Sequence, residues 1–223
     1  SSKQEYSRNS AKSSSLPDLR KYPSGTPRKK AFLRTVMPYI TSQNAAITAE
    51  RNWLISKQYQ GQWSPAERAR LKDIAKRYKV KWSGNTRKIP WNTLLERVDI
   101  IPTSMVATMA AAESGWGTSK LARNNNNLFG MKCMKGRCTN APGKVKGYSQ
   151  FSSVKESVSA YVTNLNTHPA YSSFRKSRAQ LRKADQEVTA TAMIHKLKGY
   201  STKGKSYNNY LFAMYQDNQR LIA

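Results

Sequence analysis

The feature that most constrains this chain is an apolar segment that ends in a carboxylate. Residues 102–112 are apolar on nearly every side, which predicts a helix buried all round, and Pro102 suits its first turn. Glu113 follows directly on one stripe of this helix. The stripe is formed by the residues seven, four and three positions before it, which are Val106, Met109 and Ala110. The sequence therefore predicts an acid at the end of an apolar helix.

Glu113 has two interpretations, which the spacing leaves open. Burial on an apolar face disfavours the ionised carboxylate, so its pKa should be raised, as in a general acid. Alternatively, Glu113 caps the helix or pairs with one of the many basic residues nearby. The stretch from Ser114 to Lys155 contains no Asp or Glu, so Glu113 is the only carboxylate that this region can supply to a cleft. Gly115 and Gly117 predict a sharp turn that leaves the helix end open.

The residues around this turn resemble a known enzyme family. Residues 113–117 (ESGWG) resemble the E-S-x-x-G signature of lysozyme-like enzymes. Residues 119–122 (SKLA) and 126–132 (NNLFGMK) are similar to the bacterial glucosaminidases of glycoside hydrolase family 73. Residues 199–207 resemble the family's G-Y-A-T-D-P-x-Y segment, with Lys203 in place of the usual Asp. The resemblance runs from about Pro102 to the C-terminus.

The resemblance implies both a fold and an activity. The expected fold is α+β and mainly α, a lysozyme-like domain with a small β-hairpin lobe. The expected activity is hydrolysis of β-1,4 bonds in peptidoglycan by an endo-β-N-acetylglucosaminidase that needs no cofactor and no metal. By the same resemblance, Glu113 is the general acid and Tyr200 lines the catalytic cleft. The implied substrate-binding residues are Trp116, Asn126, Asn127, Phe129, Tyr148 and Tyr207.

The chain departs from the family in its acidic residues. Many members carry a second carboxylate in a longer β-lobe, and this chain has none between Cys133 and Tyr148. The substrate's own acetamido group could then attack, or polar groups such as Tyr200 could hold a water. Attack by a sugar hydroxyl, as in a lytic transglycosylase, uses the same single acid. Glu156 is explained by a capping box with Ser153. A basic wall-binding protein without catalysis is the alternative from another class.

The pattern along the chain predicts three parts. Residues 1–27 are a disordered or loosely docked basic tail, residues 28–100 are a helical extension that packs on the catalytic domain, and residues 101–223 are the glucosaminidase domain. Pro38 should limit or kink the first helix of the extension. Ser64, Pro65 and Glu67 predict a capped helix start. Short strands are expected at 128–133 and 145–151.

The charge of the chain requires an anionic partner. The sequence contains 39 basic and 12 acidic residues, for a net charge of +27. Nucleic acid, anionic lipid headgroups and the cell wall all fit that charge. The basic residues are scattered and form no recognition motif, so we expect no specific nucleic acid. We expect a monomer whose partner is the peptidoglycan glycan strand, and peripheral contact with an anionic membrane surface stays open.

The two cysteines bear on the compartment. Cys133 and Cys138 flank Gly136, which suits a disulfide across a tight hairpin. Two free thiols are the alternative. A disulfide agrees with an oxidising compartment, so we expect a periplasmic or otherwise exported protein. The first residue is Ser, and an export signal is expected to have been removed before it.

Overall fold

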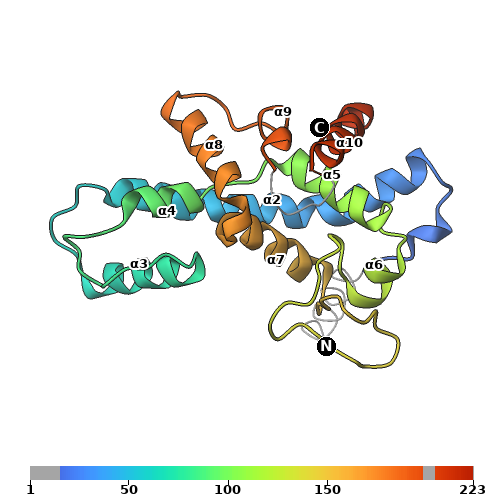
Figure 1. The fold of residues 1–223 in the computed structure, drawn as a ribbon, viewed down its shortest axis with the longest axis horizontal. Coiled ribbons are helices and arrows are strands. Elements are labelled where there is room, and N and C mark those ends of the chain that lie inside the picture. Colours follow the sequence, from blue (N-terminus) through green and yellow to red (C-terminus); the bar gives the residue numbers. More distant parts are fainter. Residues whose placement is uncertain (1–15, 198–203, 223) are drawn as a thin grey trace, which may run out of the picture. The chain divides into compact units, whose positions relative to one another are not determined.

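The structure is a computed structural model, and it describes residues 16–197 and 204–222. These residues are mainly helical, as predicted (Figure 1). The α-helices are α2 (Thr26–Lys57), α3 (Pro65–Arg77), α4 (Trp91–Arg97), α5 (Thr103–Ser114), α6 (Lys120–Asn125), α7 (Val154–Thr167), α8 (Ser172–Lys183), α9 (Ala190–Met193), α10 (Gly204–Asp217) and α11 (Gln219–Ile222). Short 3-10 turns are η1 (Leu19–Lys21), η2 (Pro169–Tyr171) and η3 (Ile194–Lys196). Within the described ranges, no helix has the length and apolarity needed to cross a membrane.

Local capping signals predicted the start of α3 correctly. The Ser64 hydroxyl accepts from the backbone N–H of Glu67 at 3.1 Å, and the Glu67 carboxylate accepts from the backbone N–H of Ser64 at 2.9 Å. This reciprocal pair satisfies two donors that the first turn of a helix leaves free.

Pro38 does not end its helix, contrary to one of the two outcomes expected for it. It lies inside α2, which runs on to Lys57. A proline in a helix interior costs about 3 kcal/mol because it removes one backbone hydrogen bond and crowds the preceding turn. Phe32, Val36 and Ile40 are fully buried around it. Each such side chain contributes about 1.5–3 kcal/mol on burial, so the packed face outweighs the proline.

The expected β-hairpin lobe is not formed. Among the described residues, the segments 128–133 and 145–151 share one isolated antiparallel bridge, between Lys132 and Tyr148, and no regular strand. Beyond this bridge, side chains form the hydrogen bonds that a continued β-ladder would make between backbone groups. The Ser149 hydroxyl donates to the Lys132 carbonyl at 2.8 Å and accepts from the Met134 N–H at 3.0 Å. Strand pairing is therefore replaced by side-chain bonds to the backbone.

The chain divides into two compact units, each built from segments that lie far apart in the sequence. The first comprises residues 1–42, 103–162 and 210–223, and the second comprises residues 43–102 and 163–209. The linear division into an extension (28–100) and a catalytic domain (101–223) follows a different boundary and stays a prediction.

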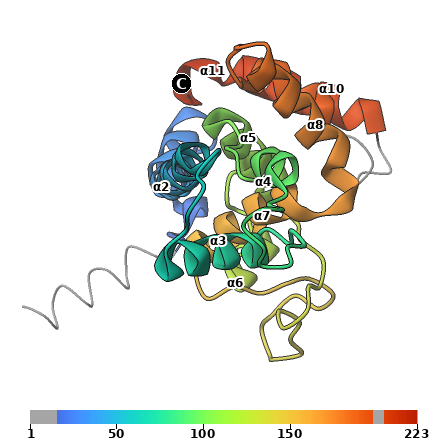
Figure 2. The same ribbon diagram turned by 90° about the vertical axis from the view of Figure 1, so that its left-hand side faces the viewer.

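The first unit is organised around α5, and α2 and α7 run close to it in both views (Figures 1 and 2). Residues 105–111 are all buried, as the apolar pattern predicts. The Tyr161 hydroxyl on α7 contacts the Met109 sulfur at 3.9 Å, and α11 packs against α5. Leu19 is fully buried although it lies in the predicted tail, so the described end of that segment is docked.

The second unit is held by an ionic network around Asp99, a residue that the sequence analysis did not single out. Its side chain is 2% exposed. Arg182 donates two hydrogen bonds to the two Asp99 carboxylate oxygens at 2.7 and 2.9 Å. The Arg178 guanidinium is fully buried and donates to the backbone carbonyls of Glu96, Asp99 and Ile100. The network connects the end of α4 to α8. These two helices also pack directly on each other.

Candidate active site

The turn after α5 is fixed by Ser114, whose side chain the sequence analysis did not assign a role. Its hydroxyl donates to the Ala110 carbonyl at 2.6 Å and accepts from the Gly117 N–H at 2.8 Å. Residues 115, 116 and 117 all have positive φ, at 56°, 55° and 80°. Such a run needs glycine at most positions, which explains the sequence G-W-G and confirms the predicted sharp turn.

Gly117 and Trp116 pack this turn against η1 and the first turns of α2. A Cβ at Gly117 would lie 2.4 Å from Cδ1 of Leu19 and 3.1 Å from Cδ2 of Phe32, so only glycine fits without displacement. The Trp116 ring packs edge-on against Phe32 at 5.6 Å, with the Lys29 ammonium 5.1 Å from its centroid. Trp116 is half-buried. Its predicted contact with substrate stays a prediction.

The asparagine run shapes the loop that follows α6. Asn126 closes the helix in the left-handed conformation at φ 52°, and its amide donates to the Phe151 carbonyl at 3.0 Å. Asn125 is buried, and its amide donates to the Val145 and Ser149 carbonyls. The run therefore makes the turn, and the left-handed residue is Asn126 rather than Asn124 or Asn125.

Asn127 is a positioning residue in this loop. Its amide nitrogen donates to the carbonyls of Met131 and Ser149, at 2.9 and 3.0 Å. Its amide oxygen accepts from the N–H groups of Phe129 and Met131, at 3.3 and 3.1 Å. The residue is 1% exposed, so these internal bonds occupy all of its capacity and leave no face for a sugar. Asn127 therefore holds the loop, and its predicted role in substrate binding stays a prediction.

The loop of residues 126–132, called the asparagine loop below, brings Gly130 close to Glu113. A Cβ built on Gly130 would lie 3.1 Å from Oε2 of Glu113, and Gly130 has φ +66°. Phe129 is also buried, at 5% exposure, and stacks on Tyr161 with a centroid distance of 4.2 Å and an interplanar angle of 8°. Phe129 thus anchors the loop in the core, and its predicted contact with substrate stays a prediction. The two halves of the motif, 113–117 and 126–132, meet at the Glu113 carboxylate.

The expected burial of Glu113 is wrong, because its side chain is exposed. The stripe that precedes it is buried as predicted, but the last turn of α5 leaves the core: Ala112 is half-buried, and Glu113 and Gly115 are exposed. What the geometry provides instead is an accessible carboxylate at the end of a rigid helix.

The remaining predicted site residues lie as follows. Tyr148 is half-buried and forms the bridge to Lys132. Tyr207 is half-buried on α10, in the second unit. Tyr200 lies outside the described residues. The disulfide between Cys133 and Cys138 is present, as predicted. Glu156 accepts from Ser152 and forms an ion pair with Arg137, in line with a structural role.

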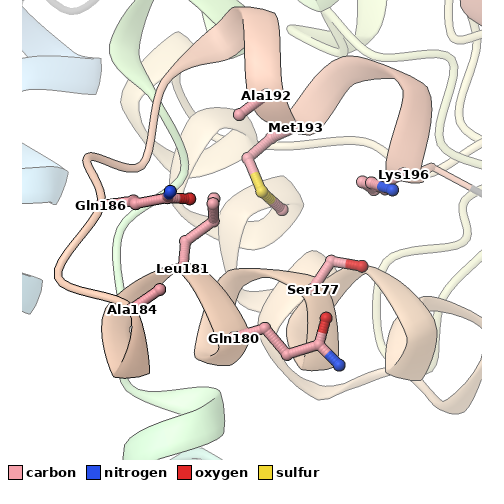
Figure 3. A pocket seen from close by; sticks show the side chains of 8 residues that line it. All are labelled: Ser177, Gln180, Leu181, Ala184, Gln186, Ala192, Met193 and Lys196. Atoms are coloured by element: carbon pink, nitrogen blue, oxygen red, sulfur yellow. The ribbon is translucent and has the colours of Figure 1, made fainter.

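The described residues contain no cluster of three or more His, Cys, Asp or Glu that could hold a metal ion. A pocket of about 300 Å³ lies in the second unit, beside α8, α9 and η3 (Figure 3). None of the described residues predicted to act on substrate lines it. Its lining residues are Ser177, Gln180, Leu181, Ala184, Gln186, Ala192, Met193 and Lys196.

Comparison with known proteins assigns the family. The chain matches no solved structure. Residues 90–220 match the model of the glucosaminidase family, described as mannosyl-glycoprotein endo-beta-N-acetylglucosaminidase. The match covers more than half of the chain and includes both Glu113 and the asparagine loop. The chain therefore belongs to the glucosaminidase family and is a glycoside hydrolase.

Proposed function

We propose that this protein is a peptidoglycan hydrolase that cleaves β-1,4 bonds of the glycan strand as an endo-β-N-acetylglucosaminidase, with Glu113 as its general acid. The observation that carries the proposal is the close approach of Gly130 to the Glu113 carboxylate, 3.1 Å from Oε2 to an added Cβ. The asparagine loop thereby fixes one wall beside an acid that solvent, and hence a polymer, can reach. A bound glycan strand would exclude water from this carboxylate and favour transfer of its proton.

The described carboxylates of the first unit are Asp18, Glu113, Glu156 and Asp217. Asp18 pairs with Arg20, and Glu156 pairs with Arg137, so both are engaged in ion pairs. Asp217 is exposed at the end of α10 and does not belong to the motif at residues 113–132. These observations support a mechanism with a single acid. We therefore propose that the acetamido oxygen of the substrate attacks C1 while Glu113 gives its proton to the leaving glycosidic oxygen. Water then opens the cyclic intermediate, and Glu113 takes back a proton.

A lytic transglycosylase is the second candidate, because it uses the same acid and the same substrate. In that reaction a hydroxyl of the sugar attacks C1 instead of water. Mass spectrometry of digested sacculi separates the two. A reducing N-acetylglucosamine end supports the glucosaminidase, and an anhydro end supports the transglycosylase.

The variant Glu113→Gln tests the proposed acid. The amide keeps the shape of the side chain but cannot deliver a proton, so the clearance of sacculi should fall by about 10²–10⁴-fold. Binding to sacculi and the melting temperature should stay near those of the wild type, since the side chain is exposed. Glu187→Gln is the matched control, because Glu187 is also exposed and belongs to the second unit. Wild-type clearance by Glu113→Gln would show that another group supplies the proton.

We also propose an exported, periplasmic location, supported by the Cys133–Cys138 disulfide and by the substrate. Fractionation of the cells tests the location, because the protein should appear in the periplasmic fraction and not in the cytosol. Thiol labelling of the freshly isolated protein, without reductant, tests the disulfide on which the proposal rests. Two reactive thiols per molecule would contradict it.

A further inference from the structure

Three tryptophans gather at one place in the second unit, and none of them belongs to the glucosaminidase motif at residues 113–132. Trp53 lies on α2, Trp63 lies just before α3, and Trp91 begins α4. The rings of Trp53 and Trp63 are 6.2 Å apart at 84°, and those of Trp63 and Trp91 are 6.4 Å apart at 36°. Figure 1 shows the end of α2 with α3 and α4 beside it. The three elements thus present a shared aromatic cluster.

A hydrogen-bond network holds the middle ring of the cluster in place. The Trp63 indole N–H donates to the Gln60 carbonyl at 3.3 Å. The Glu67 carboxylate accepts from the Gln60 amide at 3.1 Å and pairs with the Lys57 ammonium at 2.5 Å. The hydrogen bond from Lys57, followed by those from Ser64 and Gln60, lowers the pKa of Glu67 to about 2. The loop between α2 and α3 is therefore fixed, and the rings are pre-organised.

The tryptophans of the cluster are not fully buried by packing within the protein. Each of the three tryptophans is half-buried, so part of every ring stays open to solvent. Tyr59, in the same loop, is 99% exposed and has φ 69°, a conformation that a large side chain rarely adopts. Glycine or asparagine would make that turn at lower cost. An exposed tyrosine there is better explained by contact with a ligand than by the turn.

The charges around the cluster define the ligand. The Arg70 guanidinium lies 4.3 Å from the Trp53 ring centroid. Arg68, Arg70, Lys72 and Lys76 are all exposed on α3. Aromatic rings bind apolar faces of flat or cyclic ligands, and an arginine beside them pairs with carboxylates. A glycan strand that carries carboxylate-bearing peptides offers both groups.

We propose that this tryptophan surface, made of Trp53, Tyr59, Trp63, Arg70 and Trp91, is a second, non-catalytic binding site for the peptidoglycan strand. The Arg70 guanidinium lies over the Trp53 ring, and the Lys57 ammonium is 5.9 Å from the centroid of the same ring. Sugar rings therefore stack on the aromatic faces that these cations leave open, and Arg70 pairs with a carboxylate of the polymer. The inference rests on the proposed function for the identity of the polymer. The site adds affinity for intact wall and takes no part in bond cleavage.

The test uses the full chain and a double variant, Tyr59→Ala with Arg70→Gln. Both side chains are exposed, so the fold should tolerate the change. The matched control is Tyr22→Ala with Arg87→Gln, which also removes one exposed tyrosine and one exposed arginine. The double variant should bind intact sacculi roughly three- to tenfold more weakly than the wild type and the control. Cleavage of a short soluble N-acetylglucosamine oligomer should be unchanged in all three.

Each other outcome overturns the inference. Equal binding of sacculi by the double variant and the control would show that the surface takes no part in capture. An equal loss in both would show that only net charge matters. Weakened binding to single-stranded DNA, or to anionic vesicles, with sacculus binding unchanged would assign the surface to another polymer or to membrane. If the wild type clears sacculi in any of these cases, the proposed function stands and only the second site fails.

The variant Trp63→Phe gives an independent measurement. It keeps a ring in the centre of the cluster and loses the hydrogen bond to Gln60. The soluble oligomer is titrated into each protein, and binding is followed by intrinsic tryptophan fluorescence. Because the variant also lacks one fluorophore, the half-saturating oligomer concentration is compared in place of the signal size, and it should be higher for the variant. An unchanged titration would contradict stacking on the cluster.

Discussion

Replacing Gly130 with alanine tests whether the asparagine loop positions Glu113. The change has two physical effects. Gly130 has φ +66°, and an alanine in that conformation costs about 1–2 kcal/mol. The new Cβ would also lie 3.1 Å from Oε2 of Glu113, so the carboxylate must shift by a few tenths of an ångström. The first effect lowers stability, and the second moves the proposed acid.

Gly143→Ala separates these two effects. Gly143 has φ +82°, and a Cβ there would meet nothing within 4 Å. Both variants should therefore lose about 1–2 kcal/mol, which lowers the melting temperature by about 2–8 °C in a chain of this size. Only Gly130→Ala disturbs Glu113. Because a displacement of 1 Å can reduce a rate by about 10²-fold, a shift of a few tenths should reduce it by roughly three- to thirtyfold.

The assay is the initial rate of reducing-end release from sacculi, measured well below both melting temperatures and expressed per folded molecule. We expect wild-type activity for Gly143→Ala and the loss just stated for Gly130→Ala. Equal activity in the two variants would refute the argument that the loop places the carboxylate. A fall in the rate with both variants would assign the loss to backbone strain alone.

Three further predictions concern the turn, the surface charge and the remaining tyrosine. Gly117→Ala should unfold the protein at a lower temperature than Gly143→Ala, because its Cβ would overlap Leu19 at 2.4 Å, and a calorimetric scan of both checks this. Raising the salt concentration should weaken sacculus binding more than it slows cleavage of a short neutral oligomer, because the charge of +27 acts on capture; equal losses would contradict it. Tyr200→Phe should lower the turnover number without changing the melting temperature, and unchanged turnover would remove Tyr200 from the mechanism.

Local signals made much of the helical fold predictable. The capping box of Ser64 and Glu67 involves residues three apart, so it can be read directly from the sequence. The apolar segment 102–112 predicted the buried helix α5, because an all-apolar surface has no other stable position. The glycines of the turn after it predicted the left-handed backbone. These features depend on neighbours along the chain.

The features that depend on distant partners were not predictable in the same way. Short strands were predicted at 128–133 and 145–151. Instead, the side chains of Asn125, Asn127 and Ser149 bond to backbone groups that paired strands would use. The exposure of Glu113 depends on where α5 leaves the core, which its own sequence does not reveal. The tryptophan cluster joins three segments whose closeness no local pattern indicates.

Asp99→Asn should destabilise the second unit at neutral pH. The Asp99 carboxylate is almost fully buried, and Arg182 donates to both of its oxygens. Burial lowers the pKa of Arg178 to about 10, and the charge of Asp99 opposes that shift. Removing the carboxylate would leave Arg178 buried without this partner. The loss of one member of a buried ion pair costs about 3–5 kcal/mol, which urea unfolding can measure.

The same network predicts how this difference changes with acid. Burial acts to raise the pKa of Asp99, but the hydrogen bond from Arg182 and the charges of Arg178 and Arg51 outweigh it, so the pKa is lowered. A lowered folded pKa contributes stability that is present above the unfolded value of about 3.9 and is lost as the pH falls through the folded value. The difference in free energy of unfolding between wild type and Asp99→Asn should therefore be constant from pH 7 to 5. Below about pH 4 it should shrink, by at most about 1.4 kcal/mol per pH unit. A difference that stays the same at pH 3 would show that folding does not lower the pKa of Asp99, and one that grows would show that folding raises it; either result would refute the prediction.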